Sequence, residues 1–328
     1  MKMEDGGELC FPLHTNTSCR RPSSTWPEAL LVHVVLYSVS VLTVALNLLV
    51  IISISHFRQL HSPTNLLLLS LAVSDFLVGL LLMPGEVLRK WSCWILGDLL
   101  CSLYNYVSFI VTTASVGDMV LISVDRYVAI CDPLRYGTRV TEGRVKVCVC
   151  VCWLGSVLYS SLLVKGELLR PDRFNSCYGE CLIVIGHVEG VVDLVVTFVV
   201  PITVILVLYT RVFVVAVAQA RAMRCHVTAV SLQLSVSVSR RSELKAARTL
   251  GVLVLVFLLC FCPYYGVALA GEHLLNSSSG SFLLFLFYFN SCLNPLIYAL
   301  FYPWFRKAAA LILNLQILQP GSSQAHVL

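Results

Sequence analysis

Seven apolar runs, each long enough to cross a lipid bilayer, constrain this chain more than any other feature. A spanning helix needs about 20 predominantly apolar residues, and its backbone hydrogen bonds must be satisfied within the membrane. Only 12% of the residues are charged, against roughly 25% in a soluble domain. We expect an all-α membrane protein, a seven-transmembrane-helix bundle with a short amphipathic helix after span seven. The runs lie near residues 29–55, 65–88, 99–131, 145–166, 186–218, 245–271 and 281–302.

The basic residues predict how the bundle sits in the membrane. Fifteen of the 23 lysines and arginines fall on the side of the C-terminus, and eight fall on the side of the N-terminus. An excess of positive charge marks the cytoplasmic side. We therefore expect a multi-pass plasma-membrane protein with an extracellular N-terminus (1–28), a membrane domain (29–302) and a cytoplasmic helix and tail (303–328). The basic residues lie in short loops between the spans, where they set the orientation in the membrane. The net charge of +5 therefore does not indicate binding of nucleic acid.

Cysteines and glycosylation sequons agree with that orientation. Six of the 14 cysteines fall on the expected outer face, and an even set in an oxidising compartment indicates disulfides. Spacing alone leaves many pairings of six cysteines open. The sequons at Asn16 and Asn276 also fall on the outer face and are candidate glycosylation sites. The six cysteines are Cys10, Cys19, Cys93, Cys101, Cys177 and Cys181.

Ionisable groups inside the spans are costly in lipid, so each needs a reason. Asp75, Asp118 and Asp193 lie in spans two, three and five, and Asp-Arg-Tyr at 125–127 closes span three. The sequence Asn-Pro-Leu-Ile-Tyr at 294–298 closes span seven. The spans group no nucleophile with a base and no metal ligands, which argues against an enzyme, and the chain lacks the repeats of a transporter. The other spans contribute Asn47, Trp153, Pro201 and the run Cys260-Phe261-Cys262-Pro263.

This ordered set of motifs, one in each span, resembles the rhodopsin-like G-protein-coupled receptors over nearly the whole chain. The longer stretches 56–65, 125–136 and 290–308 look like the trace amine-associated receptors within that class. So do the Cys177–Cys181 segment and the extra Cys93. The resemblance implies a receptor for small amines, mostly an olfactory one, that signals through a stimulatory heterotrimeric G protein. Arrestin, a receptor kinase and membrane lipid are the further partners that it implies.

The resemblance also implies a relay at the cytoplasmic end. Arg126 is permanently cationic, and its expected partners are the adjacent Asp125 and Glu243 at the base of span six. Release of that contact lets span six swing outward and admit a helix of the G protein. Prolines in spans six and seven remove backbone hydrogen bonds and let these helices bend. The matching switch residues are Asp125, Arg126, Tyr127, Tyr209, Glu243, Asn294, Pro295 and Tyr298.

A second cluster of polar residues matches an ion site of this receptor class. Oxygen-rich side chains suit a hard cation such as Na⁺, and no other cofactor is expected. A water-filled polar network without a fixed ion is the alternative. Asp118, eight residues before Arg126, is expected to face span two or four as a structural acid. The cluster consists of Asp75, Ser115, Asn290, Ser291 and Asn294.

The expected ligand site departs from the family at one position. Amine receptors of this class carry an aspartate in span three, eighteen residues before the arginine of Asp-Arg-Tyr, and here that position is Ser108. Asp193, eight residues before Pro201 in span five, is the replacement acid, because a buried ammonium needs a carboxylate. Glu189 lies one helical turn away. It is expected either to bind the second ammonium of a diamine or to be a solvated acid at the mouth of the site.

Aromatic residues at ligand positions are expected to enclose the ammonium by cation–π contacts, each of about 0.5–2 kcal/mol, with simple packing as the alternative. Phe261 stands where the family usually has a tryptophan. A receptor for a neutral odorant, with Asp193 held in an interhelical hydrogen bond, is the competing hypothesis. The expected ligand-binding set is Asp193, Glu189, Ser108, Phe109, Thr112, Phe261, Tyr264, Tyr265 and Tyr288.

The resemblance finally implies a pairing of the six outer cysteines. One bond is expected to tie the top of span three to the second outer loop, and two further bonds are expected to involve the N-terminus. The expected pairs are Cys101–Cys181, Cys10–Cys177 and Cys19–Cys93.

Overall fold

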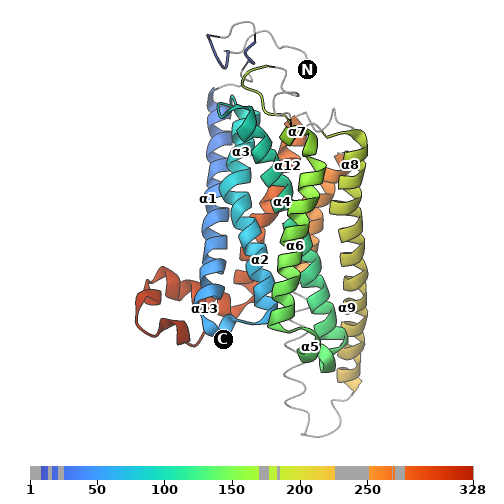
Figure 1. The fold of residues 1–328 in the computed structure, drawn as a ribbon. Coiled ribbons are helices and arrows are strands. Elements are labelled where there is room, and N and C mark those ends of the chain that lie inside the picture. The colour runs from blue at the N-terminus through green and yellow to red at the C-terminus, as the bar shows by residue number, and fades with distance from the viewer. Residues whose placement is uncertain are drawn as a thin grey trace.

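A computed structural model describes residues 9–13, 17–20, 26–169, 177–182, 185–225, 251–267, 269 and 278–327. Long helices stand side by side in one bundle (Figure 1). We call the end of the bundle near Cys101 the cap end and the end near Arg126 the tail end. In the described chain, six helical segments are long and apolar enough to cross a membrane, and a further apolar helix spans Gly251–Val267. The predicted all-α, seven-helix fold is confirmed.

The bundle is built from the following elements in chain order. Spans two and five are each composed of three consecutive helical segments. The elements are α1 (Trp26–His56), η1 (Arg58–Leu60), α2 (Pro63–Leu77), η2 (Val78–Leu82), α3 (Met83–Trp91), α4 (Gly97–Cys131), α5 (Pro133–Arg139), α6 (Glu142–Leu163), α7 (Lys165–Leu169), α8 (His187–Leu194), η3 (Val195–Val199), α9 (Val200–Cys225), the helix Gly251–Val267, α12 (Ser278–Phe301), α13 (Pro303–Leu313), η4 (Gln316–Leu318) and η5 (Ser322–Gln324).

Two π-helical turns, η2 and η3, interrupt spans two and five. Each turn ends just before a proline, Pro84 or Pro201, whose missing N–H removes one backbone hydrogen bond of the helix. A π turn carries one more residue than an α turn, so it rotates one half of the span relative to the other. The cap-end halves of these spans, α3 and α8, are the segments that carry Glu86 and Asp193.

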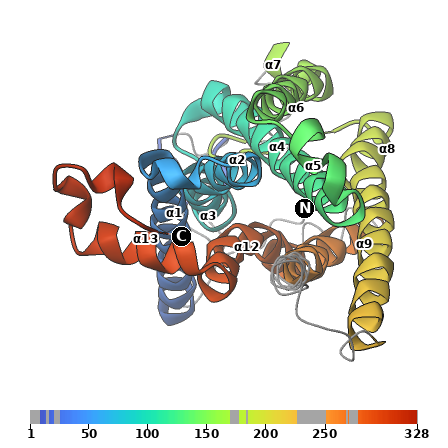
Figure 2. The same cartoon turned by 90° about the horizontal axis from the view of Figure 1, so that it is seen from below.

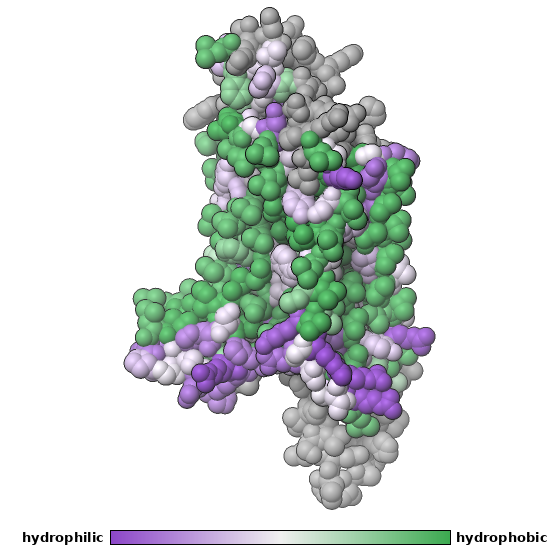
Figure 3. Space-filling model, in the orientation of Figure 1, coloured by the Kyte–Doolittle hydropathy of each residue, from purple (hydrophilic) through white to green (hydrophobic). Residues whose placement is uncertain are grey.

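The bundle has an apolar surface, and its apolar interior encloses a set of buried polar side chains. Leucines such as Leu158 and Leu162 on α6 are more than half exposed, and apolar side chains cover the middle of the face seen in Figure 3. In contrast, Asn47, Asp75 and Asn294 are fully buried. Exposed apolar surface of this extent is stable only against lipid. The arrangement is therefore that of a multi-pass membrane protein.

Span three, α4, lies at the centre of the bundle and contacts α2, α6 and α9 (Figure 2). Asp118 on this helix is buried and accepts hydrogen bonds from the Ser70 hydroxyl of α2 at 2.8 and 2.9 Å. The indole Nε1–H of Trp153 on α6 donates to the same hydroxyl oxygen at 3.0 Å. Three spans are thereby joined at one point, and of the two spans expected to face Asp118, span two supplies its hydrogen-bond donor.

Three disulfides close the cap end. The expected bond between Cys101 and Cys181 is present. The expected pairing of the other four cysteines is wrong, because the structure exchanges their partners. The observed pairs are Cys10–Cys93, Cys19–Cys177 and Cys101–Cys181.

Local backbone pairing accounts for this exchange. The N–H of Cys19 donates to the carbonyl of Tyr178 at 2.9 Å, which brings Cys19 beside Cys177. The N–H of Cys10 in turn donates to the carbonyl of Cys19 at 2.9 Å. Cys10 is thus left on the side of the segment that faces Cys93, with a Cα–Cα distance of 5.5 Å. That separation is typical of a disulfide.

The expected amphipathic helix after span seven is α13, which leads away from the bundle at the tail end (Figure 1). It buries Trp304, Phe305 and Ala308 and exposes Arg306 and Lys307. Covering one face and leaving basic residues on the other is typical of a helix that lies along a membrane surface.

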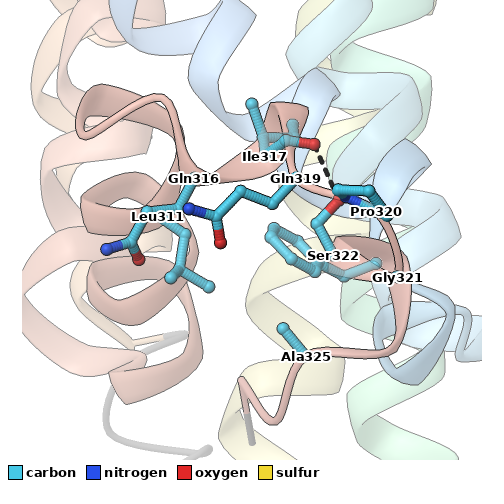
Figure 4. A pocket seen from close by; sticks show the side chains of 9 residues that line it. Leu311, Gln316, Ile317, Gln319, Pro320, Gly321, Ser322 and Ala325 are labelled. Carbon is cyan, nitrogen blue, oxygen red and sulfur yellow. Dashed lines mark hydrogen bonds between the residues drawn. The ribbon is translucent and has the colours of Figure 1, made fainter.

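The chain beyond α13 folds back beneath η1. The imidazole Nε2 of His56 lies 3.0 Å from the Ser322 hydroxyl, and the N–H of Val327 donates to Gln59 Oε1 at 3.3 Å. A groove of about 300 Å³ opens between this segment and Phe57, where the Ser322 hydroxyl donates to the carbonyl of Ile317 at 2.7 Å (Figure 4). These contacts attach the C-terminal segment to the first loop at the tail end.

Candidate ligand-binding and coupling sites

Asp193 lies on α8, in the cap-end half of span five, and is half-buried. Its Oδ1 accepts a hydrogen bond from the Tyr159 hydroxyl of α6 at 2.9 Å. The Thr197 hydroxyl donates to the backbone carbonyl of Asp193 at 2.7 Å. Within the described part of the chain, no basic side chain forms an ion pair with Asp193. The carboxylate is therefore held by neutral groups and can still bind a cation.

Aromatic side chains from three spans meet next to Asp193. The Tyr265 hydroxyl lies 3.0 Å from the Thr197 hydroxyl, and the Tyr265 ring stacks on Phe198 at a centroid distance of 4.3 Å. Tyr264 contacts both Tyr265 and Phe287, at centroid distances of 5.4 and 5.3 Å. We call the set Phe198, Phe261, Tyr264, Tyr265, Phe287 and Tyr288 the aromatic cluster.

The aromatic cluster contains residues that the sequence did not single out. Phe287 of α12 contacts four other rings, including Phe261 at 4.0 Å and Tyr288 at 5.5 Å. Phe261 also stacks on Phe257, which lies one turn nearer the tail end, at 4.1 Å. Phe287 and Phe198 were missed because spans rich in phenylalanine give no sign of which rings face inward. The sequence offered one indication of their position, namely that Phe287 precedes Tyr288 and that Phe198 lies five residues after Asp193 in the same span.

Ser108 occupies the span-three position where the family usually has an acid. Its hydroxyl donates to the carbonyl of Tyr104 at 3.1 Å within α4, and Tyr104 and Val107 on the same helix pack against the core cluster that contains Tyr288. Phe109 and Thr112 are half-buried on the same helix. The structure therefore brings Ser108 to the aromatic cluster, but Ser108 supplies no charge there.

Glu189 lies on α8, one helical turn before Asp193. Its side chain is exposed on the first turn of α8, and its carboxylate folds toward Gly186, where an added Cβ would lie 2.2 Å from Oε2. Of the two alternatives for Glu189, this position agrees with a solvated acid at the mouth of the site.

A buried ion pair that the sequence analysis missed lies on α3. Arg89 donates to Glu86 from Nε at 3.1 Å and from Nη2 at 2.8 Å, and the Glu86 side chain is 1% exposed. The Tyr104 hydroxyl of α4 lies 3.1 Å from Glu86 Oε1. Glu86 and Arg89 stand at the i, i+3 spacing that favours ion pairs on a helix. That spacing could have revealed the pair, but both residues fall where span two was expected to end.

The ion cluster expected around Asp75 is buried between α2 and α12. Asn294 donates from Nδ2 to Asp75 Oδ2 at 2.8 Å, and Ser291 is buried on the same helix as Asn294. Several buried oxygens find no hydrogen-bond partner within the described structure, and buried acceptors left in that state are costly. An oxygen-ligated cation would satisfy them, so the residues present fit Na⁺. These oxygens are Asn47 Oδ1, Asp75 Oδ1, Asn290 Oδ1 and Asn294 Oδ1.

At the tail end, Arg126 belongs to a network that joins spans two and three to α5. Its Nε and Nη2 donate to Asp125 Oδ2 at 2.8 and 2.5 Å, and Nη2 also donates to Thr64. The Tyr136 hydroxyl of α5 donates to Asp125 Oδ1 at 2.8 Å. Burial raises the pKa of Tyr136, so this phenol keeps the proton that it donates. The expected contact between Arg126 and Asp125 is confirmed.

Two other expected switch residues, Tyr298 and Tyr209, lie on α12 and α9. Tyr298 of α12 is fully buried, and its hydroxyl finds no hydrogen-bond partner in the described chain. Tyr209 of α9 lies against Gly251, where an added Cβ would come within 2.5 Å of the hydroxyl oxygen. A groove of about 350 Å³ opens beside Arg126 and Tyr136. The expected partner Glu243 and the two sequon asparagines, Asn16 and Asn276, lie outside the described residues.

Comparison with known proteins identifies the family. The model of the seven-transmembrane receptor family of rhodopsin type matches residues 46–298. Trace amine-associated receptor 13c of Danio rerio is 37% identical over 98% of this chain and 97% of its own length. The chain belongs to the trace amine-associated receptors. Trace amine-associated receptor 1 of Mus musculus is 37% identical over 95% of this chain and 98% of its own length, and receptor 8b of the same species is 38% identical over 96% and 95%.

Membership of the trace amine-associated receptors fixes the broad class of this protein. It is a multi-pass G-protein-coupled receptor and not an enzyme. The site at the cap end is therefore the candidate for ligand binding, and the network around Arg126 is the candidate for coupling. The family does not by itself assign a ligand to a receptor that has Ser108 in span three.

Proposed function

We propose that this trace amine-associated receptor senses small amines and uses Asp193 as the ammonium counter-ion. The observation that supports this proposal most strongly is the environment of Asp193. The side chain is half-buried beside the aromatic cluster and accepts a hydrogen bond from the Tyr159 hydroxyl, and no basic residue among the described ones pairs with it. A bound cation would compensate the charge of this carboxylate, because a charged group removed from water needs an opposite charge nearby. The names of the relatives, which refer to trace amines, support the same ligand class.

The aromatic cluster supplies the second part of the proposed amine site. An ammonium over the face of a tyrosine or phenylalanine gains about 0.5–2 kcal/mol. Tyr264 and Tyr265 come from the helix Gly251–Val267, and the Tyr265 hydroxyl lies 3.0 Å from the Thr197 hydroxyl, which donates to the Asp193 carbonyl. The ammonium is thus held from spans five and six, whereas Ser108 leaves span three uncharged.

The proposed signal runs from the cap end to Arg126 and then to a stimulatory heterotrimeric G protein. In this proposal the receptor is olfactory and lies in the plasma membrane, with the cap end outside the cell. The groove beside Arg126 supports coupling at the opposite end. Arrestin and a receptor kinase would act on that same cytoplasmic face. Outward movement of the helix Gly251–Val267 would open the tail end. The same movement would separate Gly251 from Tyr209.

One specific observation favours a second candidate function. The hydrogen bond between Tyr159 and Asp193 links spans four and five, and such a bond is a sufficient structural reason for a buried acid. If that is its whole role, the receptor recognises a neutral odorant on the aromatic cluster. Asp193 would then affect folding and not ligand choice.

A panel of amines and matched neutral compounds separates the two functions. Cells that express the receptor at the surface are exposed to alkylamines and to the alcohols of equal chain length, and cyclic AMP is measured. We expect amines to raise cyclic AMP at concentrations at least about tenfold below those of the matched alcohols, because only the ammonium pairs with Asp193. Activation by neutral compounds alone would establish the odorant function instead.

We also propose that Na⁺ binds at Asp75 and stabilises the closed tail end. A cation held between α2 and α12 would make separation of these spans harder, so its withdrawal should raise amine affinity by about fivefold or more. The measurement is amine binding with Na⁺ replaced by an organic cation at constant ionic strength. Asp75→Asn should lose the Na⁺ effect, whereas Asp118→Asn, at a buried acid bonded to Ser70, should keep it. Equal Na⁺ responses in the wild type and Asp75→Asn would leave the water-filled network as the correct description.

A further inference from the structure

The Glu86–Arg89 ion pair on α3 is the most heavily buried charge pair among the described residues of the cap end. The two side chains are 1% and 12% exposed. Removing both charges from water is expensive, and a buried pair rarely stabilises a fold more than apolar residues of similar size would. Through the Tyr104 hydroxyl, 3.1 Å from Glu86 Oε1, the pair connects α3 to α4. That connection uses Glu86 and not Arg89, so the role of Arg89 is the one left to explain.

The two members of the pair differ in how fully they are satisfied. Glu86 accepts from Arg89 with both oxygens and has the Tyr104 hydroxyl at 3.1 Å. A guanidinium has five N–H groups, and Arg89 uses one on Nε and one on Nη2 for Glu86. The remaining N–H groups of Arg89 meet no acceptor among the residues that the structure describes. Arg89 is thus the member with free hydrogen-bonding capacity.

The pair lies on α3 and Asp193 lies on α8, and these two helices stand on different sides of the bundle (Figure 2). Tyr104, whose hydroxyl lies 3.1 Å from Glu86 Oε1, packs against the same core cluster as Tyr264 and Tyr288. The helix α3 also contacts α12, which carries Tyr288. A ligand whose ammonium binds Asp193 and whose body covers the aromatic cluster would extend toward Arg89.

The charges of Asp193 and of the Glu86–Arg89 pair determine which chemical group of the ligand can lie beside Arg89. Glu86 and Arg89 together carry no net charge, so Asp193 is balanced by one ammonium. A second ammonium would have to displace Arg89 from Glu86 and leave a buried cation unpaired, which is strongly unfavourable. A carboxylate would come close to Glu86. An uncharged oxygen accepts from Arg89 without either penalty.

We propose that Arg89, held in place by Glu86, binds an uncharged oxygen acceptor at the end of the ligand opposite its ammonium. The ligand class is a monoamine that carries a hydroxyl, ether or carbonyl oxygen. This inference rests on the proposed function, because it assumes that the ammonium binds Asp193.

The test compares homologous series of alkylamines, the amino alcohols of equal chain length and the corresponding diamines. Potency is measured by cyclic AMP on the wild type and on the double variant Glu86→Gln/Arg89→Gln, with surface expression determined in parallel. The double change removes both charges together, so neither is left unpaired. Lys90→Gln is the matched control, since it removes a positive charge from the next position of α3.

We expect the wild type to prefer the amino alcohol over the alkylamine by about tenfold. The double variant should reduce that preference to about one and leave alkylamine potency within about threefold. Lys90→Gln should retain the wild-type preference. A ratio near one in the wild type, an unchanged ratio in the double variant, or diamines as the most potent series would overturn the inference. Failure of the amine proposal has a different signature, namely that Asp193→Asn leaves the potency of plain alkylamines unchanged.

Discussion

Replacing Asp193 with asparagine is expected to lower amine potency by about 30-fold to several-thousand-fold. Loss of a desolvated, charge-assisted contact costs on the order of 2–5 kcal/mol. Asparagine retains the size of the side chain and can still accept a hydrogen bond from Tyr159, which now donates to Oδ1 at 2.9 Å. The effect should therefore come from the missing charge. Dose–response curves for cyclic AMP, corrected for surface expression, provide the measurement.

Glu189→Gln is the matched control for this experiment. It removes the same charge from the same helix, one turn away, at an exposed position, and it should change monoamine potency by less than about threefold. Ser108→Asp tests the site from the other side, because a second anion near Tyr288 should change which amines are preferred. Unchanged amine potency in Asp193→Asn would mean that the acid is structural and that a neutral ligand binds.

Replacing Arg126 with alanine is expected to reduce G-protein coupling by more than about tenfold while ligand binding and surface expression persist. Arg126 donates to both Asp125 and Thr64 beside the groove at the tail end. Hydrogen bonds to charged groups contribute about 1.5–3 kcal/mol each, so the loss of this side chain removes the centre of the network. Cyclic AMP accumulation and radioligand or fluorescent amine binding should be measured on the same cells.

Arg139→Ala is the matched control for Arg126. Arg139 also pairs with an aspartate, Asp132, at 3.2 Å near the same end of the bundle, but the Arg139 side chain is 54% exposed and that of Asp132 is 34% exposed. Exposed pairs contribute little, so coupling should remain near the wild-type level. Asp125→Asn, which leaves Arg126 without its anionic partner, should raise signalling in the absence of ligand. Normal coupling by Arg126→Ala would remove this residue from the relay.

The sequence predicted the fold and several contacts because these depend on short-range patterns. Hydropathy over successive windows determines which segments enter the membrane, and helical periodicity places residues relative to one another on the same span. The seven spans, the direction of Asp118 and the pairing of Arg126 with its neighbour Asp125 all follow from information within one segment. Membership of the receptor family rests on motifs of the same local kind.

Contacts between segments were harder to predict. The pairing of Cys10 and Cys19 was exchanged, because partner choice depends on the backbone bonds that set Cys19 beside Tyr178. The position of Glu189 was left open by its spacing from Asp193, and the structure places its carboxylate against Gly186. Side-chain direction at the start of a helix depends on the neighbouring loop, which periodicity does not describe.

The sequence by itself determined that this chain is a seven-span receptor and where its membrane-embedded acids lie along each helix. Only the tertiary structure decided what those acids meet, such as Tyr159 beside Asp193 and the Glu86–Arg89 pair beside Tyr104. The physical reason is that a contact between spans depends on their relative rotation and depth. The π turns before Pro84 and Pro201 change that rotation in two of the spans that border the ligand site, and side-chain packing against α4 then determines which groups meet.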